Sequence, residues 1–148
     1  MSAKADFKTI FVACDHAGLE MKRHLMSRFL HLPWKDLGTN NGDSVDYPDY
    51  AAKLCHELEG HVRDSCGVLV CGSGQGMNMR ANRFPFIRSA LCWSEEVTQL
   101  AREHNDANVL CLGGRLTSFP MAERILETFL RVPFAGGRHQ ARVDKLKC

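Results

Sequence analysis

The stretch VLVCGSGQGMNM, residues 68–79, places a cysteine between an apolar run and a glycine-rich loop. Gly72, Gly74 and Gly76 allow backbone N–H groups to turn toward a ligand, and the positive end of a following helix also attracts anions. Such a loop can hold a phosphate, or an oxyanion that develops during a reaction. The same field favours the thiolate form of Cys71, which could then act as a base. The alternative is that Cys71 is a small core residue at a tight strand–helix junction.

Three familiar motifs do not fit this loop. A Walker loop needs Gly-Lys-Ser/Thr after its spacer, and nothing in the chain matches. A dinucleotide-binding motif that starts at Gly72 needs its last glycine at position 77, where Met77 stands. A cysteine phosphatase loop that starts at Cys71 needs an arginine at the same position. The loop can therefore still bind an anion through its backbone N–H groups, although it matches none of these nucleotide or phosphatase motifs.

Two further sites combine residue types suited to proton transfer. Asp15 and His16 directly follow an apolar run, and a carboxylate beside an imidazole suits proton transfer or anion binding. Alternatively, Asp15 caps a helix. His104 continues a helical apolar stripe into the segment HNDAN, where it could act in catalysis or stabilise a helix C-terminus.

The segment GGRHQAR near the C-terminus places Arg138 and Arg142 one helical turn apart, so that both face the same way. Paired guanidinium groups suit a phosphate dianion, and Arg115 could join them. The alternative is a solvated basic tail. No cluster of His, Cys and Asp has the spacing of metal ligands, so we expect no metal.

The elements that position these residues are short apolar runs alternating with helical patterns. The expected strands are 9–14, 34–37, 66–71, 89–93 and 108–113. The expected helices bury stripes formed by Met21, Leu25 and Phe29; by Ala51, Leu54, Cys55, Leu58 and Val62; by Val97, Leu100 and Ala101, after a cap at Ser94; and by Ala122, Ile125, Leu126 and Phe129. Strands without polar alternation indicate a parallel sheet covered on both faces. We therefore expect an α/β fold, a three-layer αβα sandwich of Rossmann-like type with about five parallel strands, whose ligands bind beyond the carboxyl ends of the strands.

Composition limits the class of protein. A chain of 148 residues fits one domain, and its net charge of +2 gives no reason to expect a nucleic-acid or membrane partner. No apolar run approaches the ~20 residues of a membrane span, and the N-terminus lacks a secretory h-region. The seven cysteines are odd in number and have no C-x-x-C spacing, so we expect reduced thiols in a cytoplasmic protein.

Six motifs occur together in one order along essentially the whole chain. They are CDHAG after the first strand, DYPDYA at 46–51, CGSGQGM…AN at 71–82, HNDANVL at 104–110, GGR at 113–115 and GGRHQAR at 136–142. Together they resemble the ribose, allose and galactose phosphate isomerase family, and within it the type B ribose-5-phosphate isomerases.

This resemblance implies an aldose–ketose isomerisation of D-ribose 5-phosphate to D-ribulose 5-phosphate, with neither a metal nor an organic cofactor. It implies that Cys71 is the base acting through a cis-enediolate, and that Ser73 and the Gly72–Gly76 amides bind the reacting oxygens. His104 would open the furanose ring with help from Asp15 and Asn105. Tyr47 and Asp46 would line the sugar site. The expected phosphate ligands are His16, Arg115, Arg138 and Arg142.

The resemblance also implies a homodimer, sometimes paired into a tetramer, in which each active site is built from two subunits. Segment 134–148 would contact the partner subunit. Family members that lack the cysteine place a glutamate base where this chain has Met77, so the chain fits the cysteine branch. Galactose-6-phosphate isomerase subunits often lack the HND and GGRH pieces, and both are present here. Arg80 departs from the family, which commonly has a small residue at that position.

Three alternatives remain at this stage. The same chemistry could act on a six-carbon phosphate such as allose 6-phosphate or galactose 6-phosphate. The chain could be a non-catalytic phosphate- or nucleotide-binding module, although Cys71 and His104 would then have no role. A hydrolase with a cysteine nucleophile is disfavoured by the missing arginine at position 77.

Overall fold

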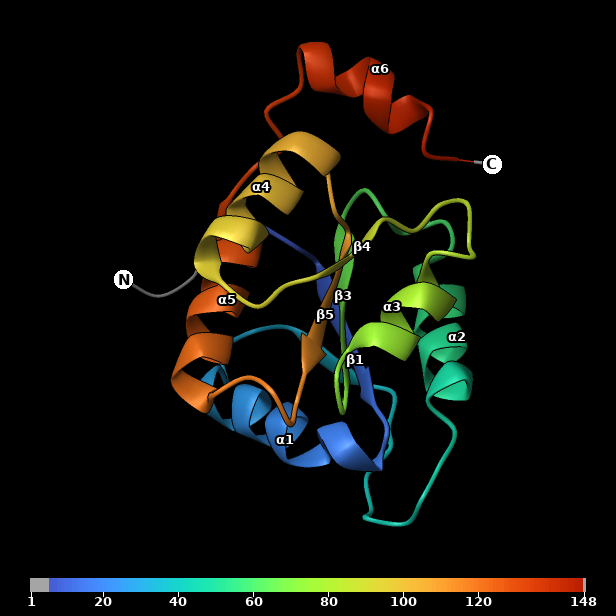
Figure 1. The fold of residues 1–148 in the computed structure, drawn as a ribbon, viewed down its shortest axis with the longest axis vertical. Helices are drawn as coiled ribbons and strands as arrows, with labels where there is room; N and C mark the ends of the chain where they lie inside the picture. The colour runs from blue at the N-terminus through green and yellow to red at the C-terminus, as the bar shows by residue number, and fades with distance from the viewer. Residues whose placement is uncertain (1–5, 148) are drawn as a thin grey trace.

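Strand β3 (Ser65–Cys71) forms the centre of the sheet, and all seven of its residues are buried. It pairs with β1 (Thr9–Cys14) on one side and β5 (Val109–Gly113) on the other. The edges are β2 (Trp34–Asp36) and β4 (Ser89–Leu91), so the strand order is β2-β1-β3-β5-β4. Every pair is parallel. The computed structural model describes residues 6–147, and Figure 1 shows their arrangement.

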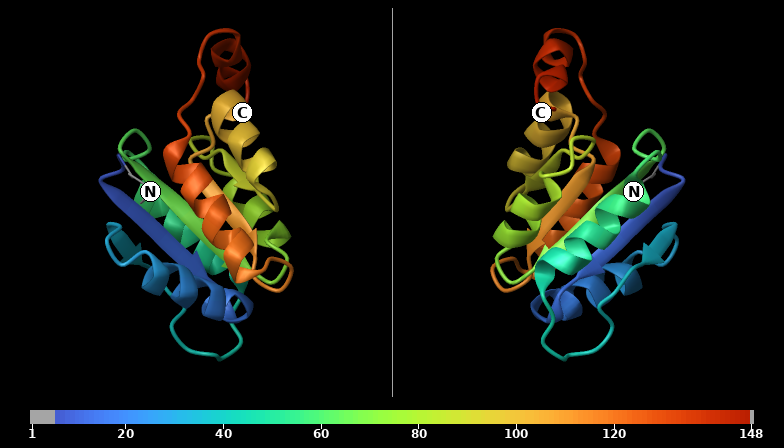
Figure 2. Two further views of the ribbon diagram at one scale, coloured as in Figure 1. Left: turned by 90° about the vertical axis from the view of Figure 1, so that its left-hand side faces the viewer. Right: turned by 90° about the vertical axis from the view of Figure 1, so that its right-hand side faces the viewer.

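Helices cover both faces of this sheet, as continuous apolar strands require. One face carries α1 (Leu19–Arg28), α4 (Glu95–Asn105) and α5 (Phe119–Arg131). The other carries α2 (Tyr47–Leu58) and α3 (Gln75–Ala81). Figure 2 shows α1 and α5 in front of the sheet in one view and α2 in front in the opposite view. The three-layer αβα sandwich expected from the sequence is confirmed.

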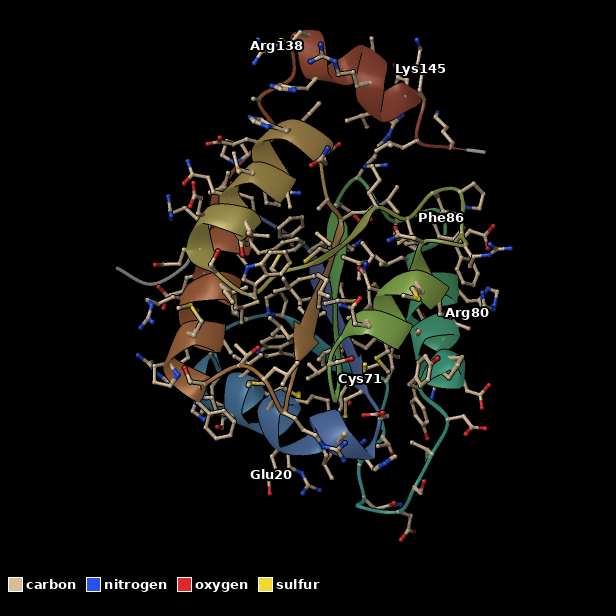
Figure 3. The ribbon with its side chains drawn as sticks, viewed as in Figure 1. Glu20, Cys71, Arg80, Phe86, Arg138 and Lys145 are labelled. Atoms are coloured by element: carbon tan, nitrogen blue, oxygen red, sulfur yellow. The ribbon has the colours of Figure 1, made fainter. Side chains whose placement is uncertain are left out.

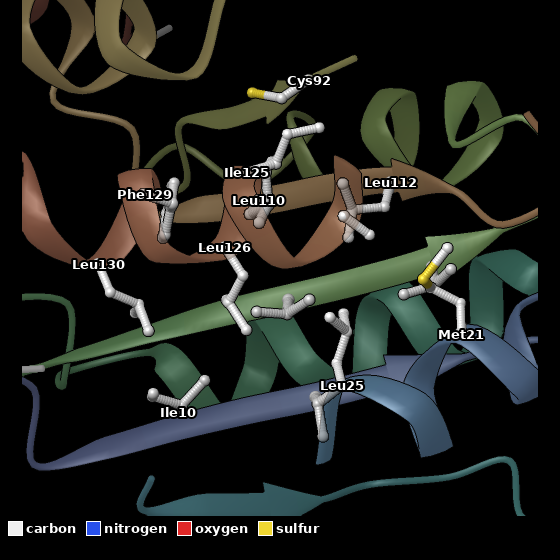
Figure 4. Packing of buried hydrophobic residues seen from close by; sticks show 14 of the residues in the cluster. Ile10, Met21, Leu25, Cys92, Leu110, Leu112, Ile125, Leu126, Phe129 and Leu130 are labelled. Atoms are coloured by element: carbon white, nitrogen blue, oxygen red, sulfur yellow. The ribbon is translucent and has the colours of Figure 1, made fainter. Parts of the chain in front are cut away.

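The core under α1 and α5 is built from the predicted stripes. Met21, Leu25, Ile125, Leu126 and Phe129 are all nearly or fully buried, and they interdigitate with side chains of the sheet in Figure 4. The regular spacing of these residues by three or four positions therefore identifies the helix faces correctly.

The stripe predicted for α4 is wrong at Leu100, which is 41% exposed. Thr98 takes the buried position instead, three residues before Ala101. Its hydroxyl donates a hydrogen bond of 2.7 Å to the carbonyl oxygen of Ser94, which removes most of the cost of burying a polar group. Ser94 caps the helix as expected, since its side chain accepts a bond from the N–H of Val97.

A short 3₁₀ turn, η1 (His16–Gly18), links the carboxyl end of β1 to α1.

The last helix, α6 (Arg138–Asp144), lies outside the three layers. Helix α6 packs beyond the C-terminus of α4, at the top of Figure 1, and the N–H of Ala135 bonds to the carbonyl oxygen of Glu103 at 3.0 Å. None of the helices within residues 6–147 has the length and apolarity needed to cross a membrane.

Candidate functional site

The carboxyl ends of β1, β3 and β5 border a cavity of about 500 Å³. Register places Cys14 beside Val70, and Cys71 beside Gly113, so residues that follow the three strands meet at one edge. The cavity is lined by Asp15, Tyr47, Cys71, Gly72, Ser73, Gly76, Arg115 and Leu116. Residues far apart in sequence that were predicted to form one site therefore do share a cavity.

Cys71 is the last residue of β3 and is 5% exposed, at the wall of this cavity. Figure 3 shows it at the lower end of the strand. Six cysteines within residues 6–147 are free. Burial raises the pKa of the Cys14 thiol to about 11 and that of Cys66 to about 12, which keeps both protonated near neutral pH. Unlike Cys14 and Cys66, Cys71 lines the cavity, where a substrate can reach its thiol.

The loop after Cys71 is tied down through its carbonyl groups. The N–H of Gly114 donates to the oxygen of Cys71 at 2.7 Å, and the N–H of Arg115 donates to the oxygen of Gly72 at 3.0 Å. Among residues 6–147, the N–H groups of Gly72, Ser73 and Gly74 have no hydrogen-bond partner. Donors of this kind beside a thiol are suited to an oxyanion.

Gly74 makes this turn possible. Its φ of +80° lies in the left-handed region, and an added Cβ would lie 2.5 Å from a methyl carbon of Leu91. The hydroxyl oxygen of Ser73 accepts a bond of 3.3 Å from the N–H of Gln75, so the hydroxyl hydrogen is available to a ligand.

Asp15 is 7% exposed and caps η1, as one of the two sequence interpretations had it. Its Oδ1 accepts bonds from the N–H groups of Ala17 and Gly18, at 3.0 and 3.1 Å. Its Oδ2 accepts none of the hydrogen bonds formed within residues 6–147, and Asp15 also lines the cavity. The cap therefore fixes the carboxylate without using both oxygens.

His16 connects the cavity edge to the segment before α2. Its Nδ1 accepts a bond of 3.2 Å from the N–H of Val45. In a neutral imidazole with Nδ1 as acceptor, the proton is carried by Nε2, which is then a donor. The arrangement suits hydrogen bonding to an anion.

Two further cavity residues lie over glycines. The Arg115 side chain packs beside Gly72, and the Tyr47 ring lies directly against Gly76. Asp46, expected in the same site, instead lines a neighbouring cavity with Asp49 and Tyr50.

The other predicted site residues lie at the opposite end of the sheet. His104 and Asn105 end α4, close to the start of β5, and Arg138 and Arg142 are exposed on α6. Strand β3 alone spans about 20 Å, at ~3.3 Å per residue. Figure 3 labels Cys71 and Arg138 at opposite ends of the molecule. A single chain does not bring these four residues to its own Cys71 cavity.

This second end of the molecule brings together two histidines and two arginines. The ring of His104 stacks on that of His139, with centroids 4.3 Å apart and planes 14° apart. Desolvation and the positive charges of His104, Arg138 and Arg142 lower the pKa of His139. Asn105 also lines a second cavity, of about 440 Å³. An anionic group is the natural partner of this end.

Comparison with known proteins covers nearly the whole chain. Residues 10–146 match the Ribose/Galactose Isomerase family. The chain belongs to this family. It is 44% identical to the solved structure of ribose 5-phosphate isomerase B from Anaplasma phagocytophilum, with a TM-score of 0.90 and coverage of 97% of this chain and 99% of that one. The resemblance drawn from the six motifs is confirmed, and the chain is an isomerase.

Two other relatives of this ribose/galactose isomerase are informative. Ribose-5-phosphate isomerase B of Escherichia coli is 37% identical over 143 residues, or 94% of each chain. Ribose-5-phosphate isomerase B from Mycoplasma genitalium, solved with bound ribulose-5-phosphate, is 38% identical with a TM-score of 0.91, covering 97% of this chain and 95% of that one.

Sequence reasoning missed three residues around these two ends. Leu116 lines the Cys71 cavity, and its position directly after the predicted Arg115 was a signal that could have identified it. His139 stacks on His104, and its place between two predicted arginines was an available signal. Lys22 is fully buried, and its position next to Met21 on a helix with a buried face was the only hint. No group of three or more His, Cys, Asp or Glu side chains suited to a metal occurs in the described part of this isomerase.

The contact between Tyr47 and Gly76 gives a specific prediction. We expect Gly76→Ala to raise KM about 3- to 10-fold, because the new Cβ would push the Tyr47 ring out of its place in the cavity wall. Steady-state kinetics measure the change. Gly42→Ala is the matched control, since an added Cβ there meets nothing within 4 Å. Equal KM values for the two variants would contradict a role for Tyr47 in the cavity wall.

Proposed function

We propose that this isomerase interconverts D-ribose 5-phosphate and D-ribulose 5-phosphate. The observation that carries the proposal is the Cys71 cavity, in which a thiol adjoins unpaired amide donors and the Arg115 side chain. The names of the relatives support the choice of a five-carbon phosphate. The six free thiols within residues 6–147 support the expected cytoplasmic setting.

In the proposed mechanism, the Cys71 thiolate removes the proton from C2 of the open-chain aldose, whose carbonyl is at C1. The electron pair moves to the C1 oxygen and forms a cis-enediolate, which the N–H groups of Gly72, Ser73 and Gly74 stabilise. The Cys71 thiol then returns the proton to C1, which completes the ketose. The Ser73 hydroxyl bonds the two reacting oxygens, and Asp15 assists their exchange of a proton.

Phosphate binding positions the carbon chain for this transfer. From the chain that holds the cavity, His16 and Arg115 take the phosphate. The remaining groups come from a second copy, whose His104 and Asn105 at the end of α4, and Arg138 and Arg142 on α6, lie at the far end of their own chain. In the proposed homodimer, or pair of dimers, α6 and the rest of segment 134–148 thus complete the partner's cavity, and His104 opens the furanose ring there.

A six-carbon sugar phosphate is the second candidate substrate. The family's description includes galactose as well as ribose, and a cavity of about 500 Å³ has room for either sugar phosphate. The presence of both HND and GGRH favours ribose.

The test compares kcat/KM of the purified protein on ribose 5-phosphate, allose 6-phosphate and galactose 6-phosphate, with a chelator present. We expect kcat/KM on ribose 5-phosphate to exceed the others at least about tenfold, the usual discrimination for one carbon unit. A higher value on a six-carbon phosphate would reverse the assignment. Turnover of none of the three would contradict sugar-phosphate isomerisation.

A further inference from the structure

A lysine with no exposed surface lies on α1, beneath the segment that follows β2. The Lys22 ammonium donates to Asp36 Oδ1 at 2.7 Å, to the carbonyl oxygen of Thr39 at 2.6 Å and to Asn40 Oδ1 at 2.9 Å. A lysine has three N–H donors, and here all three are used. Fully buried lysines are rare unless paired, so this one holds a specific structure together.

That structure is the start of segment 37–46. Asp36 Oδ1 also accepts from the N–H of Gly38 at 2.9 Å. The N–H of Cys14 donates to Gly38, and the N–H of Thr39 donates to Cys14, at 2.8 and 2.9 Å. The segment is thereby joined to the last residue of β1, directly before Asp15. Lys22 holds this connection in place through its hydrogen bonds to Asp36 and Thr39.

The far end of the same segment reaches the cavity. The N–H of Val45 bonds to Nδ1 of His16, and Tyr47 follows two residues later with its ring against Gly76. Residues 40–44 between the two ends are all exposed, so they contribute little packing of their own. The position of Val45 and Tyr47 therefore depends on α2, which begins at Tyr47 and packs on the sheet, and on how firmly the segment is held at its start.

We propose that Lys22 is a positioning residue for the isomerase reaction, fixing segment 37–46 so that His16 and Tyr47 face the substrate. This role rests on the proposed function. Within residues 6–147, Lys22 forms no hydrogen bond with His16 or Tyr47, so its effect on them is transmitted through the segment.

An apolar side chain of similar length cannot replace this anchor. Methionine would fill the space, but it would leave the buried carbonyl oxygen of Thr39 with only the Cys14 thiol as donor, at 3.6 Å between Sγ and the oxygen. A buried acceptor that loses its partner is costly to keep in place. The start of the segment is then expected to shift toward water.

The experiment combines kinetics with amide hydrogen exchange on Lys22→Met, Asn40→Ala and the control Lys35→Met. Lys35 lies on β2 beside Asp36, but its ion pair with Glu57 is exposed. We expect Lys22→Met to raise KM for ribose 5-phosphate about 10- to 100-fold with a much smaller change in kcat, and to speed exchange at residues 39–45 while β3 stays protected. Asn40→Ala should show the same pattern to a smaller degree, and Lys35→Met should match the wild type.

The outcomes separate the two proposals. If the wild type turns over ribose 5-phosphate and both anchor variants keep its KM, the positioning role is overturned. A loss of global stability with unchanged KM has the same meaning. If Lys22→Met does not fold, Asn40→Ala decides, because Asn40 is exposed. A wild type without turnover overturns the proposed function itself. The hydrogen-exchange measurement does not depend on turnover.

Discussion

Replacing Cys71 by alanine is expected to lower kcat on ribose 5-phosphate by about 10²- to 10⁴-fold, the usual contribution of a positioned general base. The thiol is the group that would carry the proton between C2 and C1, and alanine offers no basic atom in its place. The fold should survive, because only one sulfur atom is removed from a side chain at a cavity wall. Initial rates of ribulose 5-phosphate formation measure the loss, with circular dichroism as the check on folding.

Cys66→Ala is the matched control. Cys66 lies on the same strand, but it is fully buried and burial raises its pKa to about 12. We expect this variant to lose some stability and to keep its kcat. If Cys71→Ala instead turns over at the rate of the Cys66 variant, Cys71 is a structural residue and the base has to be sought at Asp15.

The sheet was predictable because its strands are short apolar runs without polar alternation. A run such as CGVLVC that alternates with helical patterns indicates a strand of a parallel sheet covered by helices on both faces, and the edge at which Cys71, Asp15 and Arg115 meet then follows from topology. Strand lengths were less predictable. β4 ends at Leu91 rather than 93, since edge strands are defined by one neighbour alone.

The sequence pattern was less reliable in predicting which side chains of a helix are buried. Leu100 is exposed and Thr98 is buried, because a threonine hydroxyl can bond within its own helix. Lys22 was missed for a related reason. Its charge is satisfied by Asp36, Thr39 and Asn40, from a segment that no local pattern brings to α1.

The separation of the candidate site into two ends is a property of the topology. A helix that connects parallel strands runs opposite to them, so its last residues lie at the amino edge of the sheet. His104 therefore cannot reach the carboxyl edge of its own chain, where Cys71 lies. Motifs along the chain give the residue types of such a site but not the number of chains that supply it.

Mixing two nearly inactive variants is expected to restore activity. Cys71→Ala lacks the base, and the double variant Arg138→Ala/Arg142→Ala lacks two phosphate contacts, with kcat/KM reduced on the order of 10³-fold. In a homodimer that shares its sites, half of the dimers from an equal mixture contain one copy of each variant. Each such dimer has one intact cavity and one with both defects, so activity should recover to about a quarter of the wild-type value.

A second mixture supplies the control. Asp15 lines the same cavity as Cys71, so co-expressed Cys71→Ala and Asp15→Asn leave one defect in every cavity of a mixed dimer. That mixture should gain nothing beyond the activity of Asp15→Asn alone. Recovery to a quarter in the first mixture and none in the second requires a cavity completed by the partner's α6. If neither mixture recovers activity, Arg138 and Arg142 do not complete the partner's cavity. They also cannot contact substrate in the cavity of their own chain, because the length of β3 separates the two ends. The arginines would then belong to a solvated tail, and the phosphate would be held by His16 and Arg115 alone.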